Sequence, residues 1–489
     1  MPILRALVAL YGLLFAALGL GFWIAPQRLA QGFHLEAVNV PGLATLRADF
    51  GGLFLTLAAL CLAAAWTRRR LPAIAAALML GAAATGRLIG WGVTGDLGGQ
   101  AASLGVEVVA IVLLALYARA LPADPAARPG RALRTAGVAL GLVALAGGAL
   151  LVPGVQQALF LQAAKAGVGH NNNALMKDDA LRVVLCGTSA PLPSASRAKA
   201  CVGVIAGGKL YIVDSGPEST ENLLKWGLPL DRVGGVLLTH FHSDHIGDLG
   251  ELNLQTRVQG RPGPLPVYGG PGVERVVAGF NEAYALDQGY RTAHHTAAMM
   301  PPATWPMVAR PVPVAANGPL PHTGVLLDDG KLKITAIETN HAPVHPAYAY
   351  RFDYKGRSVV ITGDTANYLP LATASRGADI LLSEALNREM IADMERTARK
   401  ADRPRIAHIM ADIQSYHISP TEAAGLADTA GVKLLVLYHL LPAPDNFVLR
   451  RLFTRGVGEA RRGEWDLADD GSLYTLPVGS TDIRIGRIR

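Results

Sequence analysis

The chain has 489 residues, and its 45 lysines and arginines together with 38 aspartates and glutamates make up 17% of them. An ordinary soluble protein has about 25% charged residues, whereas hydrophobic residues reach 51% here and the mean hydropathy is positive. This composition excludes a disordered or fibrous chain, and the length predicts two or three domains. The net charge of +7 lies mostly in residues 1–155, which contain 11 arginines and 5 acidic residues, while the other 334 residues contain 34 basic and 33 acidic side chains. The larger part of the chain therefore lacks the basic excess that is typical of proteins binding nucleic-acid backbones.

Long apolar runs dominate the first 155 residues. A helix needs about 20 apolar residues to cross the hydrocarbon core of a membrane, and five runs come close to that length: residues 7–24, 50–66, 71–93, 101–118 and 135–155. The first run could also be a signal peptide, but no small-x-small cleavage site follows it, so we expect it to be retained. The sequence therefore predicts an all-α transmembrane bundle of about five helices over residues 1–155. The first 120 or so residues resemble a four-helix membrane domain that is common in bacteria and has no assigned function.

Arginines set the expected orientation of this bundle. Arg5 precedes the first run, Arg68–Arg70 lie between the second and third, and Arg119, Arg128, Arg131 and Arg134 lie between the fourth and fifth. Because basic loops stay in the cytoplasm, the N terminus and these two loops are predicted to be cytoplasmic, and five spans would place everything after residue 155 outside. We expect a multi-pass protein of the cytoplasmic (inner) membrane, with the lipid bilayer as a partner and an extracytoplasmic C-terminal part.

The remainder of the chain changes character. Residues 156–180 are predicted to be a polar linker, and from residue 181 short β-rich runs alternate with helical patterns, which predicts a layered α/β domain over residues 181–489. The expected strands include 181–185, 209–213, 235–239, 333–337, 358–362, 380–382 and 433–438, and the expected helices include 217–226, 272–285 and 420–430. Cys186 and Cys201 lie at the ends of neighbouring predicted strands. They could form a disulfide in an extracytoplasmic domain, but we favour two buried unpaired thiols.

The strongest chemical signal is the segment His240-Phe241-His242-Ser243-Asp244-His245, which directly follows the apolar strand 235–239. Imidazole and carboxylate groups are ligands that suit Zn²⁺ and similar ions. In an extended segment His240 and His242 point to the same side, and a following turn brings Asp244 and His245 toward a second position. One short segment can thus supply ligands to two adjacent metal sites.

This His-x-His-x-Asp-His segment resembles the signature of the metallo-β-lactamase superfamily. The resemblance implies an αβ/βα sandwich with a two-metal site at one edge, and further His, Asp and His ligands just past later strands. His341, Asp364 and His439 occur in that order, each at the end of a predicted strand. His345 competes with His341 for the third position, and we favour His341 because it stands nearer the preceding strand.

The resemblance also implies how these residues divide between two divalent ions, with Zn²⁺ expected and Mn or Fe as alternatives. One ion would take His240, His242 and His341, and the other Asp244, His245 and His439, with Asp364 bridging. In this arrangement a metal-bridging hydroxide attacks a phosphorus, sulfur or carbonyl centre.

Further segments resemble the branch of the family that contains RNase Z, arylsulfatases and cyclic-nucleotide phosphodiesterases. These segments are Leu185–Pro191, Val213–Gly216, Arg261–Gly269 and Tyr416–Ala424. In the last of them the family's histidine protonates the leaving group and is paired with an upstream acid, and these roles would fall to His417 and Glu384. With Asp244, they are the expected catalytic residues. The alternative for His417 is a residue at a helix entry, since Ser419 and Glu422 have capping-box spacing.

We therefore expect a membrane-anchored, binuclear metal-dependent hydrolase of phosphodiester or sulfate esters, with small anionic esters as substrates. The arm that grips tRNA in RNase Z lies between the third ligand and the Gly-Asp motif, but only 22 residues separate His341 from Asp364, so tRNA is not expected. The alternatives are a lactone or other acyl hydrolase, an RNase Z-like endoribonuclease and a non-catalytic membrane sensor. His294, His295 and His345 are candidate substrate residues, although the first two could equally belong to an exposed loop. The sequence does not predict the oligomeric state.

Overall fold

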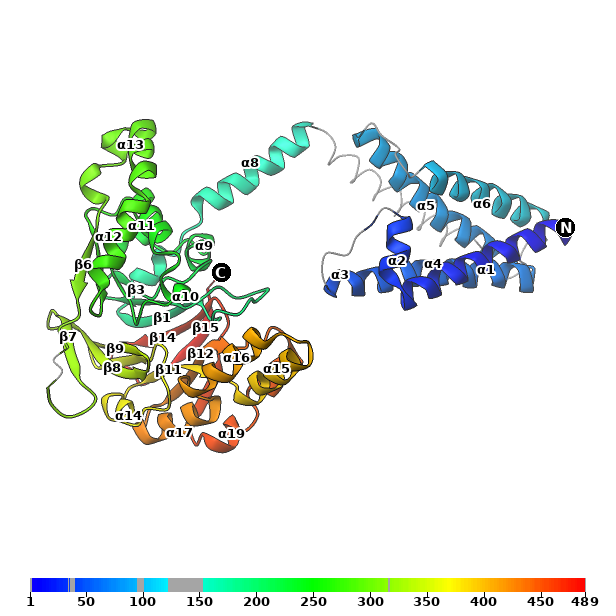
Figure 1. Cartoon of the computed structure of the whole chain (residues 1–489). Coiled ribbons are helices and arrows are strands. Elements are labelled where there is room, and N and C mark those ends of the chain that lie inside the picture. The colour runs from blue at the N-terminus through cyan, green and yellow to red at the C-terminus, as the bar shows by residue number, and fades with distance from the viewer. Residues whose placement is uncertain are drawn as a thin grey trace. The chain divides into compact units, whose positions relative to one another are not determined.

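The computed structural model describes residues 2–33, 35, 40–94, 101–121, 153–314 and 317–488. The chain divides into two compact units, Met1–Val168 and Gly169–Arg489, which are described separately (Figure 1).

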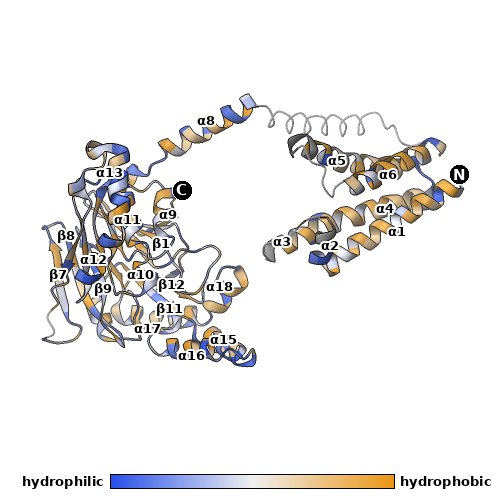
Figure 2. Cartoon of the chain, turned by 45° about the horizontal axis from the view of Figure 1, so that its top comes forward, coloured by the Kyte–Doolittle hydropathy of each residue, from blue (hydrophilic) through white to orange (hydrophobic). Residues whose placement is uncertain are grey.

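The first unit is built of helices: α1 (Pro2–Ile24), α2 (Pro26–Gly32), α3 (Val40–Thr45), a π-helical segment (Leu46–Gly51), α4 (Gly52–Thr67), α5 (Arg70–Thr94), α6 (Ala101–Ala120) and α8 (Pro153–Gly169). Four stretches are long and apolar enough to cross a membrane: Pro2–Ile24, Gly42–Thr67, Arg70–Ile89 and Ser103–Ala120. They are hydrophobic on their outer surfaces as well as on their packed faces (Figure 2). A helix that is apolar all round is typical of a membrane span.

The first four predicted spans therefore each coincide with an apolar helix, and the fifth, 135–155, lies outside the described residues except for the start of α8. Helix α8 extends over residues 156–169 of the linker predicted at 156–180, and none of its residues is buried. The boundary between the two units, after Val168, falls within this segment. Ala, Leu, Gln and Lys in this segment are good helix formers. Proline stands at the first helical position, where its missing N–H costs nothing.

The second unit contains two sheets. The first has the strand order β15-β14-β1-β2-β3-β4-β5-β6, and the second β13-β12-β11-β10-β9-β8-β7. The strands are β1 (Ala180–Gly187), β2 (Cys201–Ala206), β3 (Lys209–Val213), β4 (Val233–Leu237), β5 (Leu265–Gly269), β6 (Met307–Pro311), β7 (Thr323–Asp328), β8 (Leu332–His341), β9 (Val344–Tyr354), β10 (Arg357–Ile361), β11 (Ile380–Leu386), β12 (Leu434–Leu441), β13 (Glu464–Leu467), β14 (Ser472–Pro477) and β15 (Arg484–Arg487).

Helices cover the outer face of each sheet (Figure 1). The helices of this unit are α9 (Ser219–Lys225), α10 (Ser243–Ile246), α11 (Leu249–Val258), α12 (Val273–Ala283), α13 (Ala285–Met299), α14 (Pro370–Ala374), α15 (Arg388–Lys400), α16 (Pro404–Asp412), α17 (Pro420–Ala430), α18 (Phe447–Phe453) and α19 (Val457–Ala460). One apolar core lies between the sheets and two more lie between a sheet and its helices. This is the αβ/βα sandwich that the sequence predicts.

The central strands of the second sheet are buried on both faces, which explains their continuous apolar sequences. In β10, Val359 and Ile361 face the core between the sheets, whereas Val360 faces the helical layer. Strands β10 to β13 run parallel to one another, as do β3 to β6. The loops that follow parallel strands emerge at the same end of a sheet, so residues distant in the sequence meet there.

Cys186 and Cys201 form a disulfide, which corrects our preference for unpaired thiols. Strands β1 and β2 pair antiparallel, with a register shift between Leu185 and Gly187. This pairing brings the Cα atoms of the two cysteines to 5.0 Å, within the range that a disulfide needs. The sequence places the cysteines on neighbouring strands but does not show that the register sets them opposite each other.

Candidate metal centre

The segment His240–His245 runs from the end of β4 into α10, and its conformation is fixed by the preceding residue. Thr239 donates from its backbone N and from Oγ1 to the two carboxylate oxygens of Asp214, both at 2.8 Å. This anchors the turn at which the chain leaves the sheet. His240, Asp244 and His245 are buried, while His242 is exposed at the opening of the site.

The remaining predicted ligands reach the same place from the other sheet. His341 ends β8 next to a register shift, and His439 lies at a shift between β11 and β12, with a φ of 46° that turns it out of the regular strand pattern. Asp364 follows β10 and Gly363. A side chain at Gly363 would meet the Thr239 side chain at 2.7 Å, and its φ of 58° suits glycine. The glycine therefore allows the loop carrying Asp364 to approach the end of β4.

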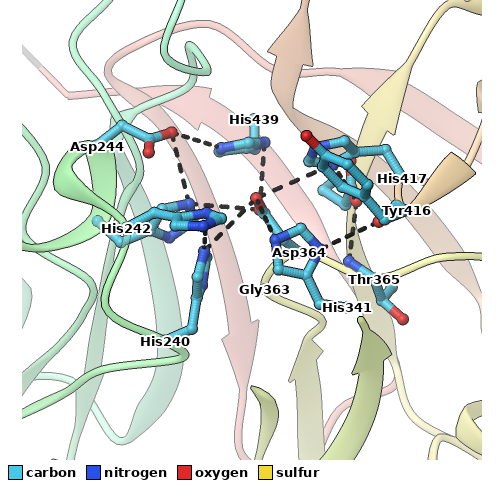
Figure 3. Close-up of polar contacts among 12 residues, drawn as sticks. His240, His242, Asp244, His341, Gly363, Asp364, Thr365, Tyr416, His417 and His439 are labelled. Atoms are coloured by element: carbon cyan, nitrogen blue, oxygen red, sulfur yellow. Dashed lines mark hydrogen bonds and ion pairs between the residues drawn. The ribbon is translucent and has the colours of Figure 1, made fainter. Parts of the chain in front are cut away.

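The structure brings all seven predicted ligands together in two groups. The side-chain donor atoms of His240, His242, His341 and Asp364 lie within 4.8 Å of one another, and so do those of Asp244, His245 and His439. The Asp364 carboxylate lies between the groups (Figure 3). Its Oδ2 is 3.9 Å from His240 Nε2, and its Oδ1 is 3.4 Å from His245 Nε2.

Several of these donor atoms are buried without a hydrogen-bond partner among the described residues: His245 Nε2, His341 Nε2, His439 Nδ1 and Asp364 Oδ1. Buried polar atoms are rarely left unsatisfied, yet here four of them face one small volume. Imidazole nitrogen and carboxylate oxygen are ligands for Zn²⁺ and similar divalent ions. The residues present therefore fit divalent metal ions.

Comparisons with known proteins agree with this geometry. A model of the metallo-beta-lactamase superfamily matches residues 200–396. The ribonuclease Z of Mycolicibacterium paratuberculosis is 34% identical over 266 residues, which cover 54% of this chain and 87% of the relative. That of Mycolicibacterium gilvum is 35% identical over 265 residues, covering 54% and 85%. The chain belongs to the metallo-beta-lactamase superfamily.

The chain is also similar to proteins of known structure. The metallo-beta-lactamase fold protein YhfI from Bacillus subtilis is 23% identical, covers 61% of this chain and 100% of its own, and has a TM-score of 0.42. The short form of human tRNase Z is 21% identical, covers 60% and 99%, and has a TM-score of 0.44. Residues 3–118 match a domain of unknown function (DUF4345), in agreement with the resemblance noted for the first unit.

Members of this superfamily bind divalent metals, and here neighbouring groups orient the candidate ligands. His245 Nδ1 is 2.8 Å from Asp214 Oδ2, and His341 Nδ1 donates to the backbone carbonyl of Tyr416 at 3.1 Å. In each case Nε2 is left to face the site. Neither Asp214 nor Tyr416 was predicted from the sequence as a site residue. For Asp214 a signal was present, since an acid follows a buried strand within Val213–Gly216, whereas a backbone contact such as that of Tyr416 leaves no trace in the sequence.

Charge and burial act on these histidines in opposite ways. Burial lowers the pKa of His240 well below its ordinary value, which keeps the imidazole neutral and its lone pair available. Burial alone would also lower the pKa of His245, but the carboxylates of Asp364, Asp214 and Asp244 raise it well above its ordinary value. His245 thus lies where the structure concentrates negative charge, and a bound cation would be favoured at the same position.

Beside the ligands lies a buried pair that the sequence predicts. His417 Nδ1 is 2.8 Å from Glu384 Oε1, and the same oxygen accepts a hydrogen bond from the backbone N of Thr365 at 2.9 Å. Burial alone would lower the pKa of His417, but the Glu384 carboxylate raises it to about 9. Ser419 and Glu422 also form the predicted capping box of α17. His417 therefore stands at a helix entry and beside the metal ligands at once, so the two interpretations of the sequence are compatible.

The other candidate substrate residues lie outside these groups. His294 and His295 are exposed on α13, so the alternative of an exposed loop is corrected to a helix. Their ring centroids lie 6.2 Å apart. The side chain of His345 is 72% exposed and lies 3.5 Å from Glu338, and it belongs to none of the metal-binding groups.

Proposed function

We propose that this superfamily member is a membrane-anchored hydrolase that cleaves phosphodiester bonds at a pair of divalent metal ions. The observation that carries the proposal is the position of Asp364 between two sets of buried ligand atoms, with the His417–Glu384 pair beside it. One set is suited to hold one ion and the second set another. When bound, two such ions supply Lewis acidity and an activated water at neutral pH.

The assignment of residues follows the two sets. His240, His242 and His341 would hold one ion, Asp244, His245 and His439 the other, and Asp364 both. Asp214 and the Tyr416 carbonyl keep the rings of His245 and His341 in the orientation that directs Nε2 into the site. Such outer contacts fix the tautomer of a metal-binding histidine and raise its basicity.

His417 is the proposed general acid. Its Nδ1 is held by Glu384, which leaves Nε2 as the nitrogen that can give a proton to the oxygen of the leaving group. Glu384 then stabilises the charged ring, and its own position is held by the Thr365 backbone N–H. Arg388 supports the loop by donating to the backbone carbonyls of His417 and Gln414 at 3.0 and 3.2 Å.

A phosphodiester is favoured over a sulfate ester because the relatives at 33–35% identity are named ribonuclease Z, and a ribonuclease cleaves phosphodiester bonds. The same observation supports an endoribonuclease as the second candidate. Against tRNA as the substrate, 16 of the 22 residues between His341 and Asp364 lie in β9 and β10. This connection forms a hairpin and leaves no protruding arm.

We also propose that the catalytic unit lies outside the cytoplasm. A disulfide such as Cys186–Cys201 is maintained in oxidising compartments and is rare in the cytosol. Four apolar helices provide the membrane anchor, and Arg5, Arg68 and Arg119 all lie at the end of the bundle that the positive-inside rule assigns to the cytoplasm. Because four spans alone would return the chain to the cytoplasm, the proposal also requires the predicted fifth span, 135–155, to cross the membrane.

The test uses the full chain, purified in detergent and loaded with Zn²⁺. Bound metal is counted by mass spectrometry, and turnover is measured on bis(p-nitrophenyl) phosphate, p-nitrophenyl sulfate, p-nitrophenyl phosphate, a lactone and a structured RNA. We expect about two metal ions per chain and the fastest turnover on the phosphodiester. Asp364→Asn should lose metal and activity, whereas the matched change His345→Ala, outside the ligand groups, should retain both. Unchanged metal content and turnover in Asp364→Asn would contradict the proposal, and absence of turnover on every ester would favour a sensor.

A further inference from the structure

Five arginines lie at one end of the membrane unit. Helix α1 begins there, α4 ends and α5 begins there, and α6 ends there, which brings together Arg5, Arg68, Arg69, Arg70 and Arg119 (Figure 1). Hydrogen bonds show that the elements meet: Arg5 Nε donates to the Ala65 carbonyl at 2.8 Å, and Arg70 donates to the carbonyls of Arg119 and Leu121 at 3.2 and 2.5 Å.

These charges lack acidic partners in the part of the chain that the structure describes. None of the five arginines has a carboxylate within ion-pair distance there, and each of the hydrogen bonds given above goes to a backbone carbonyl. Elsewhere in the same unit the usual arrangement holds, since Arg87 Nε lies 3.0 Å from Glu107 Oε1. A guanidinium has five N–H donors, so the few bonds made to carbonyls leave most of the donor capacity of Arg5 unused.

The arginines border a hollow rather than a flat surface. A cavity of about 610 Å³ is lined by Pro2, Arg5, Ala6, Ala9, Arg68 and Tyr117. A second cavity of about 480 Å³ shares Arg5 and Ala9 and continues along Leu62, Ala63, Ala65, Trp66 and Thr67. Guanidinium groups thus stand beside apolar walls, and Trp66, 85% exposed, has the position of an interfacial aromatic residue.

We propose that this hollow binds the phosphate headgroup of an anionic glycerophospholipid. Arg5 and Arg68 would pair with the phosphate, and an acyl chain would lie along the apolar wall formed by α1 and α4. Basic pockets between transmembrane helices bind anionic lipid headgroups in this way, through charge-assisted hydrogen bonds from arginine to phosphate. The inference rests on the proposed membrane anchoring and adds a specific lipid site to it.

The orientation of the chain in the membrane does not by itself account for arginines that line an apolar cavity. The positive-inside rule requires only that basic residues be present near the ends of the spans, whereas here Arg5 on α1 and Arg68 at the C-cap of α4 line one cavity that also has an apolar wall. A free phosphate would use the arginines but not the wall. The lipid is therefore the occupant that matches both parts of the hollow.

The experiment places the full chain in nanodiscs of phosphatidylcholine containing a small fraction of phosphatidylglycerol and measures which lipid stays bound after transfer to detergent, by native mass spectrometry. We expect enrichment of phosphatidylglycerol over phosphatidylcholine, reduced about five-fold for each arginine neutralised in Arg5→Gln and Arg68→Gln. Arg5→Lys with Arg68→Lys should retain the preference, because the charges remain. Arg28→Gln, on α2 at the other end of α1, is the matched control and should change nothing.

Equal retention of the two lipids, or an equal loss in Arg28→Gln, would overturn the proposal. Displacement of the lipid by an excess of inorganic phosphate would overturn it too, because phosphate competes for the arginines alone. Membrane fractionation separates this failure from that of the anchoring. A chain recovered in the soluble fraction after a carbonate wash would overturn both, whereas a membrane-integrated chain without lipid preference would overturn the lipid site only.

Discussion

His417 Nδ1 and Glu384 Oε1 lie 2.8 Å apart in a buried position, with Asp364 Oδ2 3.9 Å from the same imidazole nitrogen. In the proposed function the pair hands a proton to a group bound at the metal ligands and holds neither ion, although the ligand atoms of His417, Glu384 and Asp364 also lie within 4.8 Å of one another. A residue that protonates the leaving group matters most when that group leaves poorly by itself.

This predicts that His417→Ala will lower kcat by about 10²–10⁴-fold on a dinucleotide, whose leaving alcohol needs a proton, and far less on bis(p-nitrophenyl) phosphate, whose leaving phenolate does not. Glu384→Gln should follow the same pattern more weakly, because the amide retains a hydrogen bond but not the charge. Metal content should stay at the wild-type value in both variants. Equal losses on the two substrates, or loss of metal, would contradict the role as general acid.

A second prediction concerns Asp214, which accepts hydrogen bonds from Thr239 and lies 2.8 Å from His245 Nδ1. Asp214→Asn preserves the shape, and asparagine tolerates the φ of 59° found there. The loss of charge should weaken metal binding about 10–100-fold, as is typical of outer contacts to a metal-binding histidine. Competition with a chelator of known affinity measures the change. Asp353→Asn, which removes only a contact with Arg351 on β9, is the control and should bind metal as the wild type does.

Much of the site could be predicted because its ligands follow buried strands. The apolar runs of β4, β10 and β12 mark strands buried on both faces, and a polar residue directly after such a run is easily recognised. What the sequence does not reveal is the register. The shifts that turn His341 and His439 into the site, and the pairing that joins Cys186 to Cys201, depend on how strands align, which no local pattern specifies.

The segment between the two units shows a second limit of prediction from the sequence. Residues 156–180 are predicted to be a polar linker, and α8 forms over much of this segment without any buried residue. Only the helix propensity of its residues favours a helix here. Hydrophobic periodicity, which is the stronger guide elsewhere, gives no signal for a helix that buries no face.

A third prediction concerns the disulfide between Cys186 and Cys201. Cys186 and Cys201 close a loop of about 15 residues, and such a cross-link stabilises the folded state by about 3 kcal/mol. Reduction, or Cys186→Ser with Cys201→Ser, should therefore lower the free energy of unfolding of the catalytic unit by roughly that amount. Pulse proteolysis of the full chain across a urea series measures it. Reductant should have no further effect on the double variant, and an unchanged midpoint of the reduced wild type would contradict the prediction.

The last prediction concerns the dependence of stability on pH. The buried carboxylate of Asp379 lies 3.0 Å from Arg357 Nε and 2.6 Å from Lys433 Nζ, and it accepts from the Ser358 backbone N at 2.9 Å. Burial alone would raise the pKa of Asp379, but these donors hold it below its ordinary value of 3.8. Because the pKa is lowered in the folded state, the carboxylate contributes fully to stability above about pH 4 and loses that contribution as the pH falls through the folded-state value.

Asp379→Asn should therefore lower the free energy of unfolding at pH 7 by roughly 2–3 kcal/mol, since it leaves the buried Arg357 without its counter-charge. It should also flatten the decline in stability of the wild type below pH 4, because the variant has no carboxylate to protonate at this position. Urea midpoints at pH 7, 5, 4 and 3.5 measure both effects. Asp179→Asn, which removes an exposed carboxylate 2.6 Å from Lys355 Nζ, is the matched control and should have a smaller effect at pH 7. A variant that keeps the wild-type slope below pH 4 would show that other carboxylates set the acid sensitivity of this unit.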